Sequence, residues 1–418
     1  MAIKRIKVSN FKSFKDLDLE LGNFNVVIGA NASGKSNFSE VFKFLKDIEG
    51  NSLNDAISMN YGIESLLNLK IGRSSDFLIQ VHLDTSFGWG TGSQALKIHG
   101  ITYQFVLQFR GPKNGYRIIR DELTQKFEIT RLKEREKKLF EDKVLGGGEF
   151  TICNVDGKPE LSFNPPEIKS LFEGEKAIPP LPFFPKLFGE KIPTGTLLIR
   201  TPYSIIPPWE TLFRNIMIYN IDPHTAKKPV EIAGKEELKE NGDNLSLVVS
   251  RIIDDKNKKR KLCNLMKDLL LFFEDIDTEK FAEKSVMMKL QESYYKDDYI
   301  RAYLLSDGTM NITALIIALY FEEKDTIIIE EPERNIHPHL ISRVMDMMKD
   351  ASRNKQIIVT THSPEVVKHA GLENLLLISR DKDGFSAISK PGEKKEVKIF
   401  LENELGLDEL YVQDLLTV

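Results

Sequence analysis

The sequence predicts an α/β protein whose parallel sheet draws on both ends of the chain, with a β-rich region and a helical region inserted between them. Three observations lead to this fold class. Residues 25–29, NVVIG, form an apolar strand-like run that leads into a helical pattern. Two further runs of β-type residues, 326–329 and 356–361, lie near the other end of the chain. Continuous apolar runs of this kind are typical of buried parallel strands.

The composition is that of a globular chain. With 418 residues, the chain is long for one hydrophobic core, so we expect two lobes or one elaborated domain. Hydrophobic residues make up 41% and charged residues 29%, which excludes a disordered or fibrous chain. The formal net charge of -4 argues against a protein that coats nucleic acid by bulk electrostatics, although it leaves room for a local basic patch.

Cysteine content and hydropathy predict a cytoplasmic protein without membrane contact. Cys153 and Cys263 are the two cysteines, and neither belongs to a CxxC pair, so we expect two free thiols in a reducing compartment. No charged leader with an apolar core opens the chain. The longest apolar run, 312–321, is too short to span a bilayer.

The first apolar strand ends in a glycine-rich loop. Before it, Ile3, Ile6 and Val8 alternate with polar residues as in a half-exposed strand. Residues 29–36, GANASGKS, then fit the pattern G-x-x-x-x-G-K-[ST] between a strand and a helix, where backbone N–H groups can wrap a phosphate. We predict a nucleotide phosphate site at Gly29, Asn31, Ser33, Gly34, Lys35, Ser36 and Asn37.

Two side chains of this loop have defined roles in the pattern. Lys35 would reach the β- and γ-phosphates, and Ser36 would ligate Mg²⁺. A chance glycine-rich turn is the alternative, but the flanking strand and helix favour the phosphate site. The predicted helix places four apolar residues on one face, namely Phe38, Val41, Phe42 and Leu45.

The second strand, 326–329, ends in two adjacent carboxylates. In this arrangement Glu330 would hold the Mg²⁺ shell and Glu331 would polarise the attacking water. Two carboxylates at a buried strand end repel one another unless a cation lies between them, which favours a metal. The alternative is an acidic turn on the surface.

Histidines follow the second and third strands. His362 comes directly after the third strand, where a γ-phosphate sensor is expected, although a lone histidine after a strand is more often structural. His337, in NIHP, is either a turn-stabilising residue or a functional one. We favour a catalytic role for His362 and leave both interpretations of His337 open.

A Ser-Asp-Gly-Thr tetrad precedes the apolar run 310–320. Ser306 and Asp307 are good N-cap residues, and Gly308 allows close backbone approach. By itself the tetrad indicates an ordinary capped core helix. Its position between the glycine-rich loop and the paired carboxylates gives it a second interpretation.

In order, these motifs resemble the ABC-type ATPase heads of the RecF, SMC and OLD proteins, and most closely the bacterial AAA-family ATPases related to RecF. The resemblance covers residues 1–39 and 303–367. It implies that LSDGT stands where these families carry LSGGQ, so that Ser306 and Gly308 would touch the γ-phosphate held by a second subunit. It also makes Lys12 and Ser13, in RIKVSNFKSF, candidate nucleotide contacts. Asp307 departs from LSGGQ, as does Thr309, and no confident Q-loop glutamine is found.

The predicted domain organisation has four parts. Residues 1–75 form the first part of the head, 76–165 a β-rich subdomain, 166–300 a connector with a helical insertion, and 301–418 the rest of the head. The β-rich part contains a hairpin turn at Asp156-Gly157. Proline and aromatic residues crowd the connector at 178–193 and 203–213, and a helical stretch is expected over 234–296.

Charged segments elsewhere are given structural interpretations. The runs 130–138 and 255–261 mix acids with bases, so we expect solvated helix faces rather than phosphate contacts. Residues 380–384, RDKDG, resemble the Asp-x-Asp of a Toprim nuclease, but too few residues follow for that domain, so we expect a hairpin turn.

The resemblance implies a head-to-tail dimer, or a higher homo-oligomer, that closes around Mg-ATP, hydrolyses it slowly and acts as a molecular switch. Its common settings imply anti-phage defence with a nuclease or toxin subunit. One alternative is a RecF-like repair ATPase that binds DNA, and another is a scaffold that holds its nucleotide without hydrolysis. Glu331 and His362 argue against the scaffold, which needs neither.

Overall fold

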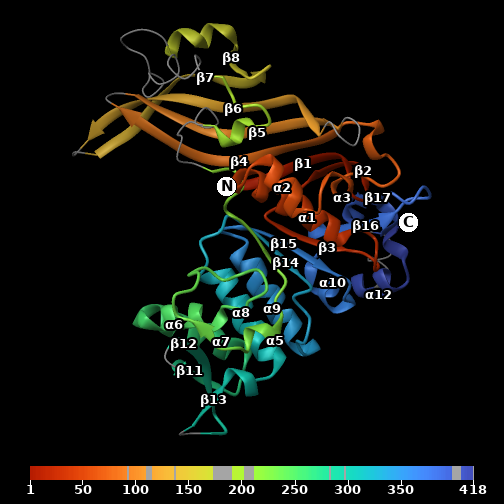
Figure 1. Cartoon of the computed structure of the whole chain (residues 1–418). Helices are drawn as coiled ribbons and strands as arrows, with labels where there is room; N and C mark the ends of the chain where they lie inside the picture. The colour runs from red at the N-terminus through yellow and green to blue at the C-terminus, as the bar shows by residue number, and fades with distance from the viewer. Residues whose placement is uncertain are drawn as a thin grey trace. The chain divides into compact units, whose positions relative to one another are not determined.

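A computed structural model describes residues 1–91, 94–109, 115–135, 138–172, 191–201, 211–281, 284–295, 298–397 and 406–417. The chain forms two compact units (Figure 1). The first unit comprises Met1–Leu21, Glu40–Asn215 and Arg380–Ala387. The second unit comprises Gly22–Ser39, Ile216–Ser379 and Ile388–Val418. Each unit therefore collects segments that lie far apart in the sequence.

A six-stranded sheet, in the order β17-β16-β3-β15-β14-β9, organises the second unit. Strands β9, β14, β15, β3 and β16 pair in parallel, which confirms the predicted α/β fold class. The apolar runs predicted as buried strands are β3, β14 and β15, and their aliphatic side chains are buried. The bounds are β3 Phe24–Ile28, β9 Ile216–Tyr219, β14 Thr326–Glu330, β15 Gln356–Thr361, β16 Leu375–Arg380 and β17 Ser386–Ser389.

Helices pack with this sheet into one hydrophobic core. The most buried is α8 (Asp307–Tyr320), in which every residue from Thr309 to Leu319 is buried, in agreement with its nearly continuous apolar sequence. The others show one apolar face. They are α5 Pro223–Ala226, α6 Leu245–Asp254, α7 Lys256–Leu269, α9 Pro338–Ala351, α10 Pro364–Ala370 and α12 Leu407–Val412.

A small antiparallel sheet also belongs to the second unit, in the order β10-β12-β11 with β13 paired to β12. The helical prediction for 234–296 is correct for α6 and α7 but wrong before Leu245 and after Leu269. The segments of β11 and β12 are strands because they pair with one another, and Ile276 lies opposite Leu290 with both side chains buried. The bounds are β10 Val230–Glu231, β11 Phe273–Phe281, β12 Ser285–Glu292 and β13 Tyr299–Arg301.

The first unit contains a seven-stranded antiparallel sheet in the order β2-β1-β4-β5-β6-β7-β8. This confirms the strand-rich interpretation of 76–163. Asp156 and Gly157 both have positive φ in the two-residue turn between β7 and β8, as predicted. The bounds are β1 Ala2–Phe11, β2 Phe14–Glu20, β4 Phe77–Thr91, β5 Gln94–Phe109, β6 Tyr116–Arg135, β7 Lys138–Val155 and β8 Lys158–Asn164.

The remaining helices follow the glycine-rich loop. Helix α1 (Lys35–Gly50) begins in the second unit and belongs to the first from Glu40 onward. Its predicted apolar face is buried. Helices α2 (Leu53–Met59) and α3 (Ile63–Leu66) come next. Short 3₁₀ helices are found at Gly72–Ser74, Pro166–Phe172, Leu198–Arg200, Ala302–Leu304, Leu372–Asn374, Pro391–Glu393 and Leu415–Thr417.

One of the two charged runs that were predicted as helix faces is helical, and the other is not. Residues 255–261 open helix α7 as predicted, and the Asp255 side chain accepts hydrogen bonds from Asn257 N and Lys258 N. The prediction of a helix for 130–138 is wrong, because strand β6 runs to Arg135 and pairs with β7 along this stretch. Most of the proline-rich connector at 178–193 and 203–213 lies outside the described residues.

The predicted turn at 380–384 is present. Asp381 N donates to Phe385 O at 2.9 Å, and the Asp381 carboxylate accepts from Asp383 N and Phe385 N. These bonds use the carboxylate locally, as in an Asx turn. The four-part domain division stays a prediction.

Candidate functional site

Three neighbouring strands of the second unit carry the predicted catalytic segments at their carboxyl ends. Strand β15 lies between β3 and β14, and all three are parallel. The glycine-rich loop follows β3, His362 follows β15, and Glu331 follows β14. Because the carboxyl ends of parallel strands meet at one edge of a sheet, these segments share that edge, where α/β proteins bind ligands.

The backbone of the glycine-rich loop requires its glycines. Gly34 has φ of 118° just before helix α1, a value that side chains rarely allow. A Cβ atom at Gly29 would lie 2.4 Å from Ile378 O, so the strand end and β16 approach too closely for any side chain. Ala32 is also left-handed, with φ of 63°. The loop is therefore held in a tight turn immediately before α1.

Lys35 is the first residue of α1, and its side chain folds back over the loop. Lys35 Nζ donates to Gly29 O at 2.7 Å and to Ala30 O at 3.0 Å. Burial lowers the pKa of Lys35, and the charges of Glu331 and Glu333 partly oppose this shift. Two carboxylates from the segment after β14 thus lie close enough to influence the charge of the ammonium.

Glu331 is constrained in both backbone and side chain. Its φ is 46°, a conformation uncommon for a residue other than glycine, and its N–H donates to Thr360 O at 2.8 Å. Oε1 lies 3.0 Å from His362 Nδ1, and Oε2 accepts a hydrogen bond from the Arg334 guanidinium. Burial alone would raise the pKa of Glu331, but the Arg334 and His362 contacts together hold it below its usual value.

Glu330 belongs to the same network through Asn220, the residue that follows β9. Asn220 Nδ2 donates to Glu330 Oε2 at 3.0 Å, and Asn220 Oδ1 accepts from Arg334 at 3.4 Å. Arg334 therefore connects both carboxylates, one directly and one through an amide. Neither Asn220 nor Arg334 is predicted from the sequence; Asn220 follows β9, which lies in a region assigned to the connector.

Glu333 is a second carboxyl that sequence analysis left unassigned. Its Oε1 accepts from Thr361 Oγ1 at 2.5 Å, whereas Oε2 is buried and has no hydrogen-bond partner among the described residues. Burial raises the pKa of Glu333, and the nearby Glu331 charge adds to this effect. The EEPE spacing, which places Glu333 two residues after Glu331, is the signal that could have identified it.

The tetrad before α8 has the predicted capping geometry. Ser306 is the N-cap, and its Oγ accepts from Thr309 N at 3.1 Å. A Cβ atom at Gly308 would lie 2.6 Å from Asn335 O, so the close approach is to the chain that follows the paired carboxylates. Asp307 forms an ion pair with Lys227. The Ser306 residue itself is exposed.

Lys12 and Ser13 lie in the first unit, where their side chains contact other protein groups. Lys12 Nζ forms an ion pair with Glu40 Oε2 at 2.6 Å. Ser13 is buried, and its Oγ accepts from Ser386 Oγ at 2.8 Å. Their assignment as nucleotide contacts stays a prediction.

Two of the other assignments are structural. His337 is the N-cap of α9, with its side chain accepting from His339 N, so the turn-stabilising interpretation is the one the geometry supports. Cys153 and Cys263 are free thiols, as predicted. None of the described helices is both long and apolar enough to cross a bilayer.

The donors assigned to Mg²⁺ fit that ion by their chemistry. Mg²⁺ prefers hard oxygen ligands and typically takes one or two from the protein, with phosphates and water completing its shell. The Ser36 hydroxyl and the Glu330 carboxylate are such donors. Within the described ranges no group of three or more His, Cys, Asp or Glu residues is arranged to hold a metal, so a site built from protein ligands alone is not found there.

Comparison with known proteins identifies ATPase sequence in two parts of the chain. Residues 1–144 match the family described as AAA ATPase domain. Residues 224–368 match the family described as AAA domain, putative AbiEii toxin, Type IV TA system. The first match contains the glycine-rich loop, and the second contains Ser306, Glu331 and His362.

Curated relatives match short segments. A stretch of 67 residues, 16% of the chain, is 42% identical to the DNA replication and repair protein RecF of Desulforudis audaxviator. A stretch of 148 residues, 32% of the chain, is 23% identical to the uncharacterized protein MJECL43 of Methanocaldococcus jannaschii. The chain spans 19% and 38% of the lengths of these two relatives.

Solved structures of SMC heads are similar at low identity. The SMC head domain from Thermotoga maritima covers 93% of this chain and 99% of its own, with 14% identity and a TM-score of 0.44. The Smc head with an extended coiled coil from Pyrococcus furiosus, bound to the C-terminal domain of ScpA, covers 96% and 99%, with 13% identity and a TM-score of 0.49. Residues 1–144 and 224–368 thus match families of AAA domains, and one short segment of the chain is similar to RecF.

Proposed function

We propose that this chain binds Mg-ATP on residues 29–36 and hydrolyses it at the edge formed by β3, β15 and β14. The observation that carries the proposal is the 3.0 Å contact between Glu331 Oε1 and His362 Nδ1. It joins the ends of two neighbouring parallel strands beside the strand that leads into the loop. A carboxylate paired with an imidazole in this position suits the orientation of an attacking water.

Each group has a distinct role in the proposed reaction. Lys35 would leave the loop carbonyls for the β- and γ-phosphates, which are stronger partners for an ammonium. Glu331, kept ionised by Arg334 and His362, would accept a hydrogen bond from the attacking water. His362 would contact the γ-phosphate. Mg²⁺, held through Ser36 and Glu330, would supply positive charge against the phosphates.

The other assigned residues complete the nucleotide site. Asn31, Ser33 and Asn37 would contact phosphates beside Gly29 and Gly34 of the loop. In the first unit, Lys12 and Ser13 would contact the nucleotide. We further propose a head-to-tail homodimer in which Ser306 and Gly308 of one subunit complete the site of the other.

The cellular role of the switch is proposed from the relatives. The description of the family matched by residues 224–368 favours a defence or toxin-related setting with a separate effector, such as a nuclease or toxin subunit. The segment that is 42% identical to RecF favours the alternative, an ATPase that acts on DNA in repair. Two measurements separate these roles. Copurification of the tagged chain with the product of a neighbouring gene would favour the effector role, and tight binding of duplex DNA at about 0.15 M salt would favour the repair role.

The test of hydrolysis uses Glu331→Gln, which keeps the shape of the side chain but removes its charge. We expect kcat to fall by about 100-fold or more while ATP still binds, because the water loses its acceptor. Lys35→Ala should instead weaken ATP binding itself. Glu323→Gln, at an exposed glutamate before β14, is the matched control and should retain activity.

Steady-state ATPase rates and equilibrium binding of a fluorescent ATP analogue give both quantities. Wild-type turnover by Glu331→Gln would refute the assigned role. Wild-type protein that binds ATP without any turnover would instead establish the scaffold alternative.

A further inference from the structure

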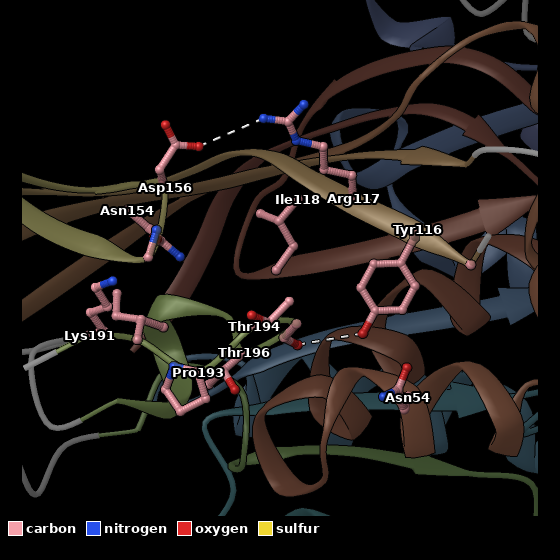
Figure 2. A pocket seen from close by; sticks show the side chains of 14 residues that line it. Asn54, Tyr116, Arg117, Ile118, Asn154, Asp156, Lys191, Pro193, Thr194 and Thr196 are labelled. Atoms are coloured by element: carbon pink, nitrogen blue, oxygen red, sulfur yellow. Dashed lines mark hydrogen bonds and ion pairs between the residues drawn. The ribbon is translucent and has the colours of Figure 1, made fainter.

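The first unit contains a cavity of about 590 Å³ that none of the proposed ATPase residues lines (Figure 2). Its walls come from the start of β6, the turn between β7 and β8, the loop 191–196, and Asn54 of α2. This volume lies within the range of small-molecule sites, roughly 300–1,000 Å³. The cavity is lined by residues of the first unit alone, so its properties do not depend on the second.

Polar groups dominate the walls of this cavity. Hydroxyls come from Thr194, Thr196 and Tyr116, and amides come from Asn54 and Asn154. Figure 2 shows these side chains around the hollow, with Tyr116 at one side and Lys191 at the other. Such a lining can exchange many hydrogen bonds with a ligand, so it favours a polar, hydroxyl-bearing molecule.

The charged groups in the lining give the cavity a positive balance. Arg117 and Lys191 are cationic, and Asp156 is the one carboxylate in the lining. Arg117 Nη2 lies 3.7 Å from Asp156 Oδ1, and the two side chains are 59% and 88% exposed. Because the pair is exposed and its atoms are far apart, it contributes little to stability. A bound anion can therefore replace Asp156 as the partner of Arg117 at low cost in free energy. Lys191 forms no hydrogen bond or ion pair with another described residue.

The walls are braced by hydrogen bonds between segments. Ile192 N donates to Gly157 O at 2.7 Å, which ties the 191–196 loop to the β7–β8 turn. Gly157 N donates to Asn154 Oδ1 at 3.0 Å, and Tyr116 Oη reaches Gly195 O at 3.5 Å. Because these contacts exist before any ligand arrives, binding would order few additional groups.

We propose that this cavity is a binding site for a small phosphorylated sugar or a molecule of that class. The phosphate would lie between Arg117 and Lys191, with the guanidinium turning from Asp156 to the stronger charge. The hydroxyls would bond to the Thr194 and Thr196 side chains and to Asn54. A cation is disfavoured because two positive side chains face one negative side chain.

The test uses ribose 5-phosphate as the probe and Lys35→Ala protein as the background. This substitution removes the main phosphate partner of the loop 29–36, so binding reports on the cavity and not on the proposed ATP site. We expect ribose 5-phosphate to bind at least about tenfold more tightly than either ribose or inorganic phosphate, because each fragment lacks one set of partners. Isothermal titration calorimetry measures all three.

Charge reversal locates the site. Arg117→Glu and Lys191→Glu should each weaken ribose 5-phosphate binding by about tenfold or more, because attraction becomes repulsion. Arg120→Glu is the matched control: this exposed arginine lies on the same strand, pairs with Glu122 and does not line the cavity. Unchanged thermal unfolding would show that each variant is folded. In a separate variant, Thr194→Val tests the hydroxyl contact of Thr194 without changing the charge of the cavity.

Three results would overturn the proposal. One is equal affinity for ribose and ribose 5-phosphate. Another is equal affinity for inorganic phosphate and ribose 5-phosphate, which would leave a bare anion site. The third is retained binding in folded Arg117→Glu and Lys191→Glu proteins. Failure of these tests leaves the proposed ATPase intact, because neither Lys35 nor Glu331 lines the cavity.

Discussion

At Glu331, backbone and side chain are held by different neighbours. A left-handed φ of 46° costs free energy for any residue with a Cβ atom, and such conformations gather at functional sites. The N–H bond to Thr360 O keeps the backbone there, while His362 and Arg334 hold the two carboxylate oxygens. The carboxylate is therefore oriented before any substrate binds, which favours its use on a water molecule.

Arg334 should act as a positioning residue through Glu331. Arg334→Ala removes a contact that stabilises the ionised carboxylate, so the pKa of Glu331 should rise and the acidic limb of kcat against pH should move to higher pH. We expect kcat at pH 7 to fall by about tenfold or less and KM for ATP to stay unchanged, since the contact is half-exposed. ATPase rates from pH 5 to 9 measure both effects.

Arg334→Lys provides the control for that experiment. A lysine keeps the charge, so it should restore part of the acidic limb even though it loses the planar geometry. An acidic limb that stays in place in Arg334→Ala, or that is the same in both variants, would contradict the positioning role.

Helix α8 is buried from Thr309 to Leu319, but it begins at an exposed serine. Most of its residues are apolar and pack in the core, whereas the buried Asn311 donates from Nδ2 to Arg334 O at 2.5 Å. The tetrad combines two requirements, because Ser306 caps the helix and Gly308 leaves space for Asn335 O. Capping alone therefore explains part of the motif, and substitutions must separate it from any contact with nucleotide.

Two substitutions at Ser306 make that separation. Ser306→Ala should lower the free energy of unfolding by about 1 kcal/mol, because Thr309 N loses its acceptor. Ser306→Asp should keep the cap and the stability, but it adds a negative charge where we propose the γ-phosphate of the other subunit. Loss of ATPase activity by a stable Ser306→Asp protein supports the phosphate contact, and full activity would leave capping as the whole role. Urea unfolding and ATPase assays supply the two readouts.

Strands β5 and β6 hold the segment 197–201 through a buried carboxyl. Asp121 accepts from Tyr103 Oη at 2.9 Å and from Leu198 N at 2.7 Å. Burial raises the pKa of Asp121 to about 6, which outweighs these hydrogen bonds. The folded state therefore favours the protonated form of Asp121 more strongly than the unfolded chain does.

This shift predicts a pH dependence of stability. The folded pKa of about 6 exceeds the ordinary 3.8, so the contribution to stability is complete below pH 3.8 and is lost as pH rises through 6. The loss is on the order of 3 kcal/mol at most. Urea unfolding between pH 4 and 7.5 should show a decline in wild type that Asp121→Asn reduces, while Asp156→Asn, at an exposed carboxyl, keeps it. An identical decline in all three proteins would contradict this assignment.

Each unit of the whole molecule is built from three separate stretches of chain. The glycine-rich loop and the paired carboxylates lie some 300 positions apart in sequence, yet both belong to the second unit because β15 pairs with β3 and with β14. Helix α1 then continues from that unit into the first. The proposed site therefore depends on the complete parallel sheet and not on any single segment.

A mixing experiment tests the proposed dimer at this scale. Lys35→Ala should lose ATP binding, and Ser306→Arg should bind ATP but lose turnover, because its long side chain would block the second subunit. In a one-to-one mixture, half of the dimers are mixed and each has one intact composite site, so roughly a quarter of wild-type activity should return. ATPase activity of the mixture after subunit exchange measures this. No recovery despite exchange, or full activity of either single variant, would contradict the composite site.

The sequence by itself determined the features that depend on local chemistry. The loop 29–36, the carboxylates after β14, the cap at Ser306 and the turn at Asp156-Gly157 each follow from a few adjacent residues with a required conformation or period. The corresponding strands and helices are present in the structure. The same reasoning assigned the segments of β11 and β12 to a helix, because their pairing with one another is not visible in the local sequence.

Tertiary structure alone decided which side chains meet. Asn220 became part of the carboxylate network because β9 pairs with β14, and Glu333 became buried because Thr361 lies at the end of the neighbouring strand. Gly308 must likewise be glycine because Asn335 O lies too close for a Cβ atom, and no local sequence pattern reveals that contact. Strand pairing between distant segments brings these atoms together, and pairing depends on the packing of the whole sheet rather than on the residues beside each site.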